Sequence, residues 1–164
     1  MRSILIAILL LAVQANAETA IEIGISNVGY RSTHSGMLML QERFGKYAVG
    51  LGYISRQELN TCDRPDCQWL VREQLLFGVE RLFTRKCLTF GIGPYWFQNT
   101  NRITGTHLNI RVALEVELNK HLSVKASHFS NAGSGAPQIV CEGDRCITGA
   151  HNMGQDALLI VWRF

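Results

Sequence analysis

The sequence predicts an all-β protein, an eight-stranded antiparallel up-and-down β-barrel, from three observations. Apolar and polar residues alternate with a period of two along most of the chain. The gaps between the alternating segments are long and short in turn. The charged residues of these segments fall mainly on the face opposite the apolar one. Together these patterns favour a closed sheet whose two rims and two faces differ in character.

The amino-terminal end has the composition of a secretory signal peptide. Arg2 precedes an unbroken apolar run at 4–13 and an Ala-Asn-Ala cleavage site at 15–17. The run is too short to span a bilayer as a helix. We therefore expect residues 1–17 to be removed and residues 18–164 to form one domain of an exported protein.

The charge balance gives little support to a nucleic-acid partner. The chain has 16 Lys and Arg residues against 13 Asp and Glu, a formal net charge of +3. The cations are scattered along the sequence rather than run together. A polyanionic lipid headgroup remains open as a partner.

Residues 106–118, THLNIRVALEVEL, show the alternation most clearly. Every second residue from Leu108 to Leu118 is apolar, and the residues between them include Arg111 and two glutamates. Segments of this kind number eight and lie at 19–28, 36–43, 46–55, 69–82, 86–97, 104–118, 121–130 and 156–164. The stretch at 69–82 also has the spacing of an amphipathic helix, and we interpret it as a strand because its neighbours are strands.

The linkers predict which ends of the strands lie together. Long polar gaps follow the first, third, fifth and seventh strands, especially at 56–68 and 131–155, whereas GK, TRK and NK connect the others. Short turns at one rim and long loops at the other are typical of outer-membrane barrels, whose long loops face outward.

The charges predict which face is inside. The residues opposite the apolar stripes are Glu22, Lys46, Arg72, Glu80, Arg111, Glu115, Glu117, Lys125 and Arg163. A soluble lipocalin-like barrel, the structural rival, would place polar residues outside instead. We therefore predict a transmembrane β-barrel with a lipid-facing apolar wall and a polar network inside. The final strand, which ends in Phe164, resembles the aromatic-ended last strand of bacterial outer-membrane proteins.

The cysteines are those of an oxidising compartment. Cys62 and Cys67 lie in one Cys-x4-Cys loop, Cys141 and Cys146 lie in another, and Cys87 falls in a strand-like run. Local pairing within each loop, with Cys87 free, is the preferred interpretation. A zinc site is the alternative, although the spacing is not one familiar for zinc.

Residues 127–133, SHFSNAG, combine a histidine, a serine and a turn. Continuing the apolar face of the seventh strand by twos places His128 and Ser130 outward, at the long-loop rim. The same counting in the last strand turns Asp156 outward beside them. A His-x-Ser pair on a strand is usually without function, and Asn-Ala-Gly is an ordinary turn opening. Their lipid-facing placement next to a carboxylate favours catalysis, because an unpaired polar group in hydrocarbon is costly.

These three residue types predict ester hydrolysis. His128 would accept the hydroxyl proton as Ser130 attacks a carbonyl, and Asp156 would orient the ring and stabilise the imidazolium. The donors expected for the developing oxyanion are Asn131 and the backbone amides near Ala132 and Gly133. The remaining histidines form no comparable group and are expected in loops, turns or the lumen: His34, His107, His121 and His151.

The motif HFSNAG, followed by HNMGQD and an aromatic-ended strand, resembles the PagL-type lipid A deacylases over about the last 40 residues. The resemblance implies an eight-stranded outer-membrane barrel that removes the ester-linked acyl chain at position 3 of lipid A without a metal or other cofactor. It implies Ser130 as nucleophile, His128 as base and Asp156 as acid, with Asn131 and Asn152 in support. Two features depart from the pattern: the acid is aspartate rather than glutamate, and the loop between the motifs is longer and contains two cysteines.

The sequence thus predicts an outer-membrane serine esterase whose substrate is lipid A or lipopolysaccharide. The rivals are a non-catalytic barrel acting as an adhesin or structural protein, and an esterase for other membrane lipids. The sequence leaves open the acyl chain removed, the regulation of activity and whether the chain forms a homodimer.

Overall fold

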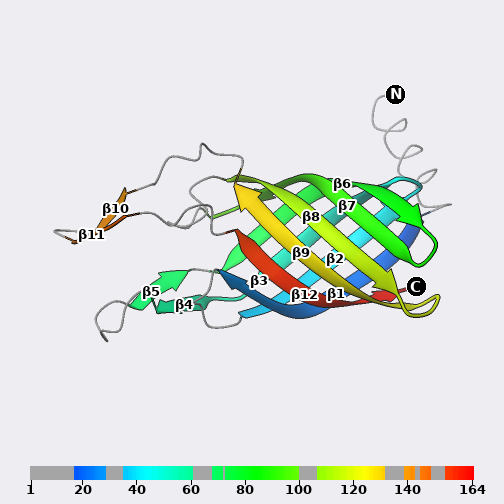
Figure 1. The fold of residues 1–164 in the computed structure, drawn as a ribbon, viewed down its shortest axis with the longest axis horizontal. Helices are drawn as coiled ribbons and strands as arrows, with labels where there is room; N and C mark the ends of the chain where they lie inside the picture. The colour runs from blue at the N-terminus through cyan, green and yellow to red at the C-terminus, as the bar shows by residue number, and fades with distance from the viewer. Residues whose placement is uncertain are drawn as a thin grey trace, which may run out of the picture.

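The computed structural model describes residues 17–28, 35–60, 68–71, 73–99, 107–131, 139–142, 145–148 and 154–164. Eight antiparallel strands form a closed barrel in the order β1-β12-β9-β8-β7-β6-β3-β2 (Figure 1). The first and last barrel strands pair with each other, so the sheet has no free edge. No helix among these residues is long and apolar enough to cross a membrane. The predicted eight-stranded antiparallel barrel is confirmed.

Seven of the eight barrel strands overlap the predicted segments with ends shifted by at most four residues, and β6 departs further. They are β1 (Ala17–Val28), β2 (Ser35–Phe44), β3 (Tyr47–Ile54), β6 (Gln74–Arg85), β7 (Leu88–Phe97), β8 (Leu108–Glu117), β9 (Leu122–Asn131) and β12 (Gln155–Arg163). Of the predicted signal peptide at 1–17, residues 1–16 lie outside the described residues, and Ala17 is the first residue of β1.

The short connections all lie at one rim, which we call the turn rim. Gly45 and Lys46 join β2 to β3 as predicted, and Lys46 is therefore an exposed turn residue rather than an inward one. The TRK connection was placed too early, because strand pairing continues through Arg85 and the turn is Lys86 and Cys87. Cys87 is thus exposed in a turn instead of lying in a strand, and it is a free cysteine as expected.

Two small hairpins extend from the opposite rim, the loop rim (Figure 1). They consist of β4 (Gln57–Asn60) with β5 (Gln68–Val71), and β10 (Ile139–Glu142) with β11 (Arg145–Thr148). The prediction of one strand over 69–82 was wrong, because its first part belongs to β5 and the barrel strand starts at Gln74. Glu73, a charged residue in the apolar register, marks the break.

The outer wall of the barrel is apolar, as predicted. Along β6, for example, Leu75, Phe77 and Val79 are exposed, and the residues between them are buried. The same alternation holds in β3, β7 and β12. An exposed apolar band on every side of a barrel is the surface expected of a protein surrounded by lipid.

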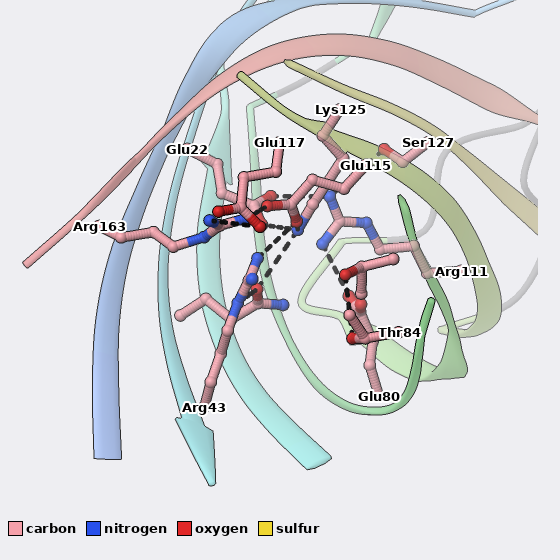
Figure 2. Close-up of polar contacts among 12 residues, drawn as sticks. Glu22, Arg43, Glu80, Thr84, Arg111, Glu115, Glu117, Lys125, Ser127 and Arg163 are labelled. Carbon is pink, nitrogen blue, oxygen red and sulfur yellow. Dashed lines mark hydrogen bonds and ion pairs between the residues drawn. The ribbon is translucent and has the colours of Figure 1, made fainter. Parts of the chain in front are cut away.

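The interior holds the predicted charges as a paired network, drawn in Figure 2. Arg111 donates to Glu22 at 2.8 Å and to Glu80 at 2.7 Å, and all three side chains are buried. Glu115 accepts from Arg43 at 2.5 Å and also pairs with Lys125 and Arg163. Mutual pairing is what allows charges to be buried at all. Glu117 is exposed at the turn rim, where its carboxylate lies 3.8 Å from Arg163 Nη1. Arg72 lies outside the described residues.

The expectation of a wholly polar interior was wrong. The half of the lumen next to the loop rim contains an apolar cluster formed by Met37, Met39, Ile54, Leu76, Tyr95, Phe97, Phe129, Ala157 and Leu159. These residues occupy inward positions of their strands. The alternation identifies the inward positions but does not predict that those near the loop rim pack together as an apolar cluster. Ion-paired side chains therefore fill the half of the lumen next to the turn rim, and mainly apolar side chains fill the half next to the loop rim.

Candidate active site

Strand β9 directs alternate residues of the heptapeptide to opposite sides of the wall. Lys125, Ser127 and Phe129 are buried in the lumen, so His128 and Ser130 lie on the outer face, where each is partly exposed. The side chains sit near the end of β9 that leads into the loop rim. The outward placement predicted for both residues is confirmed.

Strand β12 brings Asp156 directly opposite His128. The two residues are Cα partners in the antiparallel register, and His128 Nδ1 lies 2.7 Å from Asp156 Oδ1. The carbonyl of Asp156 also accepts a hydrogen bond from Ser26 Oγ of β1 at 2.9 Å. Facing residues of paired strands are close enough for a short side chain, so aspartate reaches the ring without the extra methylene of glutamate.

This hydrogen bond defines how the imidazole can act. A nitrogen that faces a carboxylate carries the proton, so the neutral ring has Nδ1 protonated and Nε2 free to accept. The side chains of His128 and Asp156 are 45% and 64% exposed, so the pair lies on the surface of the barrel rather than in its core. A contact of this kind between an imidazole nitrogen and a carboxylate is one requirement for the base and acid of a catalytic triad.

Gly154 makes room for this ring. A Cβ atom added there would lie 2.2 Å from His128 Cε1 and 2.4 Å from Nε2, much closer than non-bonded atoms approach. The imidazole therefore packs directly against the backbone at 154. The sequence analysis did not single out this residue, although HNMGQD contains a glycine two positions before the acid, and a glycine often marks a close approach.

Ser130 follows His128 by two residues on the same face. Alternate residues of a strand are about 6.5 Å apart. Among the described residues, no hydrogen bond joins the hydroxyl of Ser130 to His128. Catalytic contacts commonly tighten only when substrate binds. The structure thus brings His128 and Asp156 together across two strands, and Ser130 lies two residues beyond His128 on the same face of β9.

The strand is supported from inside by Phe129. Its ring packs edge-on against Tyr95 and Phe97, with centroids 5.5 and 5.3 Å away, and the guanidinium of Arg111 lies 5.3 Å from its centroid. Aromatic packing and a buried cation fix the inward side chain. Because Phe129 lies between His128 and Ser130 in the chain, this packing also fixes the backbone that bears them. The sequence analysis did not identify this role.

The oxyanion donors remain predictions. The backbone of Asn131 ends β9 opposite Asn109. The side chain of Asn131 and the residues Ala132, Gly133 and Asn152 lie outside the described residues.

The other described histidines lie outside the candidate site, at a strand end and in a turn. His107 precedes β8, has Nδ1 2.8 Å from the carbonyl of Phe97 and stacks on Trp96. His121 lies in the turn before β9 and stacks on Trp162. His34 and His151 fall outside the described residues. Within the part of the chain that the structure describes, no three His, Cys, Asp or Glu side chains gather as a metal site would require.

The fold defines a class: closed eight-stranded barrels with an apolar outer wall and a filled, partly charged lumen. Among solved structures, the chain is similar to Neisserial surface protein A, with a TM-score of 0.45, 8% sequence identity, and coverage of 90% of this chain and 96% of that one. No protein-family model matches the sequence, and no curated protein matches it.

Proposed function

We propose that this protein is an outer-membrane serine esterase that hydrolyses the acyl ester at position 3 of lipid A. The observation that supports the proposal best is the 2.7 Å contact between His128 Nδ1 and Asp156 Oδ1 on the outer wall. The motif resemblance of the last 40 or so residues supplies the substrate class.

The placement of the pair favours a functional role over a structural one. A histidine and an aspartate on the lipid-facing side of a barrel contribute nothing to packing in the lumen, which is closed by Phe129 and its neighbours. Exposed ion pairs typically add only about 0–1 kcal/mol to stability. A weakly stabilising polar pair on a largely apolar wall is therefore better explained by chemistry performed there than by the fold.

The chemistry follows from the ring orientation. His128 Nε2 removes the proton from Ser130 Oγ as that oxygen bonds to the ester carbonyl carbon, and Asp156 stabilises the imidazolium that results. Collapse of the tetrahedral intermediate breaks the bond to the lipid A oxygen, which takes the proton from His128. Water then attacks the acyl-serine by the same route, which releases the fatty acid and restores Ser130.

The location of the site suits a lipid substrate. In an outer-membrane barrel the loop rim faces outward, and lipid A occupies the outer leaflet with its acyl esters just below the headgroup. A site on the outside of the wall, near the loop ends of β9 and β12, would meet these esters by lateral diffusion and would need no cavity.

Mass spectrometry of lipid A from Gram-negative cells expressing the protein tests the proposal. Wild type should yield lipid A lacking one acyl chain, and Ser130→Ala should leave lipid A intact. Ser123→Ala is the matched control, because Ser123 lies on the same strand but points into the lumen, where among the described residues its hydroxyl has no partner. Deacylation retained in folded Ser130→Ala would refute the assignment of Ser130.

The same experiment separates the rivals. A non-catalytic barrel predicts intact lipid A with wild type and all variants. An esterase for other lipids predicts intact lipid A together with fatty-acid release from purified phospholipids that depends on Ser130.

A further inference from the structure

A group of cations lies on the outer wall at the turn rim, far along the strands from the candidate active site. We call it the basic rim cluster, and it consists of Lys46, Arg81, Arg85 and Lys86. All four side chains are exposed. Arg81 and Arg85 project outward from β6, and the two lysines lie in the β2–β3 and β6–β7 turns.

The register brings Lys46 beside the arginines. Arg81 is the Cα partner of Tyr47 in β3, and the amide of Leu82 donates to the carbonyl of Lys46 at 2.7 Å. Arg85 and Lys86 continue the same strand into the next turn. Residues distant in the sequence therefore form one cluster, which the scattered cations of the sequence did not reveal.

None of the four cations of the basic rim cluster forms an ion pair with a described residue. Two described carboxylates lie at the same rim and have other partners: Glu42 of β2 accepts a hydrogen bond from Thr19, and Glu117 of β8 pairs with Arg163. The only acid within β6, Glu80, points into the lumen and is held there by Arg111 and Tyr95. The outward residues of the neighbouring strand β7 are apolar.

Arg81 is also unusual in its surroundings. It interrupts an outward apolar stripe between Val79 and Phe83, and its guanidinium carbon lies 5.2 Å from the Phe83 ring centroid. An arginine on a lipid-facing wall is costly at the bilayer centre and tolerated near the headgroups, which its long side chain can reach.

Lys86 has a positive φ of 55°, in the left-handed region that disfavours residues with a Cβ. The corresponding first residue of the β2–β3 turn is Gly45, with a φ of 60°. The chain thus keeps a cation where glycine would be unstrained. Strained residues tend to occur at functional positions.

We propose that the basic rim cluster binds the phosphodiester headgroup of an anionic phospholipid in the leaflet opposite lipid A. The inference rests on the membrane placement proposed above but not on the esterase activity. The cations would contact the phosphate, and the acyl chains would lie along the apolar outer wall formed by residues such as Val49 and Val79, which are paired across β3 and β6. Juxtamembrane cations attract anionic lipids in this way.

Native mass spectrometry of the full barrel released from nanodiscs tests the proposal. The nanodiscs contain phosphatidylglycerol and phosphatidylcholine with identical acyl chains, and the measured quantity is the ratio of the two lipids retained. Wild type should favour phosphatidylglycerol. Arg81→Gln should lower the ratio about fivefold, and Arg81→Gln with Arg85→Gln about 30-fold.

Lys120→Gln, in the β8–β9 turn, is the matched control and should lower the ratio less than either arginine variant, because Lys120 does not belong to the basic rim cluster. An unchanged ratio in the double variant overturns the proposal, and so does an equal loss in Lys120→Gln. Displacement of the lipid by glycerol phosphate at equal concentration also overturns it, because the site would then recognise a free phosphate. Ser130→Ala should keep the wild-type ratio, so failure of the esterase proposal is distinguishable.

Discussion

Replacing Asp156 with asparagine separates the catalytic contribution of the carboxylate from its structural one. The substitution keeps the size of the side chain and removes its charge, so the 2.7 Å contact with His128 no longer stabilises an imidazolium. With the two side chains 45% and 64% exposed, the contact between His128 and Asp156 should contribute at most about 1 kcal/mol to stability. We therefore expect Asp156→Asn to fold and to migrate as a heat-modifiable barrel like wild type.

The effect on the rate should be far larger. Removing the charge of a buried triad aspartate lowers kcat about 10⁴-fold. Because Asp156 is exposed, we expect a smaller decrease in rate, about 10²–10³-fold. That range corresponds to about 2.7–4.1 kcal/mol of transition-state stabilisation.

The assay is the initial rate of fatty-acid release from purified lipid A in mixed micelles. Glu73→Gln, which removes an exposed carboxylate near the same rim, should keep the wild-type rate. Asp156→Glu, which keeps the charge, should retain more activity than asparagine. A rate for Asp156→Asn within about threefold of wild type would refute the triad reasoning.

Three further predictions concern the barrel and its loops. Arg111→Met leaves two buried carboxylates without their shared cation and should lower the free energy of unfolding in urea by about 3–5 kcal/mol. Gly154→Ala puts a methyl group 2.2 Å from His128 Cε1, so the ring must move and the rate in the lipid A assay should fall about 100-fold with little loss of folded protein. Cys141 and Cys146 are Cα partners in the β10–β11 hairpin and should form a disulfide, which peptide mapping without reductant should detect.

The architecture was predictable because each pattern reports one geometric variable. A period of two identifies the face of each residue, and the alternation of long and short gaps identifies the rim of each strand end. The continuation of the His128 face by twos, and of the Phe164 face back to Asp156, was enough to place both on the outer wall.

The missing elements share a physical cause. A period of two does not show where one strand ends and the next begins. The sequence therefore predicted one strand at 69–82, whereas β5 and β6 are separate strands with Glu73 between them. The pattern also does not reveal which inward residues pack on one another, and the apolar cluster around Phe129 went unseen. The contact at Gly154 depends on three-dimensional approach rather than spacing.

The two faces of β9 show how a barrel with a filled lumen would hold the proposed active site on its outer wall. Inward, Phe129 is clamped by Tyr95, Phe97 and the cation of Arg111, which itself is fixed by two buried glutamates. On the outer face, the backbone of the adjacent His128 is held rigid by the same packing. His128 lies opposite Asp156 because β9 and β12 pair in a register that the closed barrel fixes. A site on a wall has no pocket to enforce its geometry, so its precision must come from the strand that bears it. Residues that never contact substrate should therefore matter to the rate as well as to the fold.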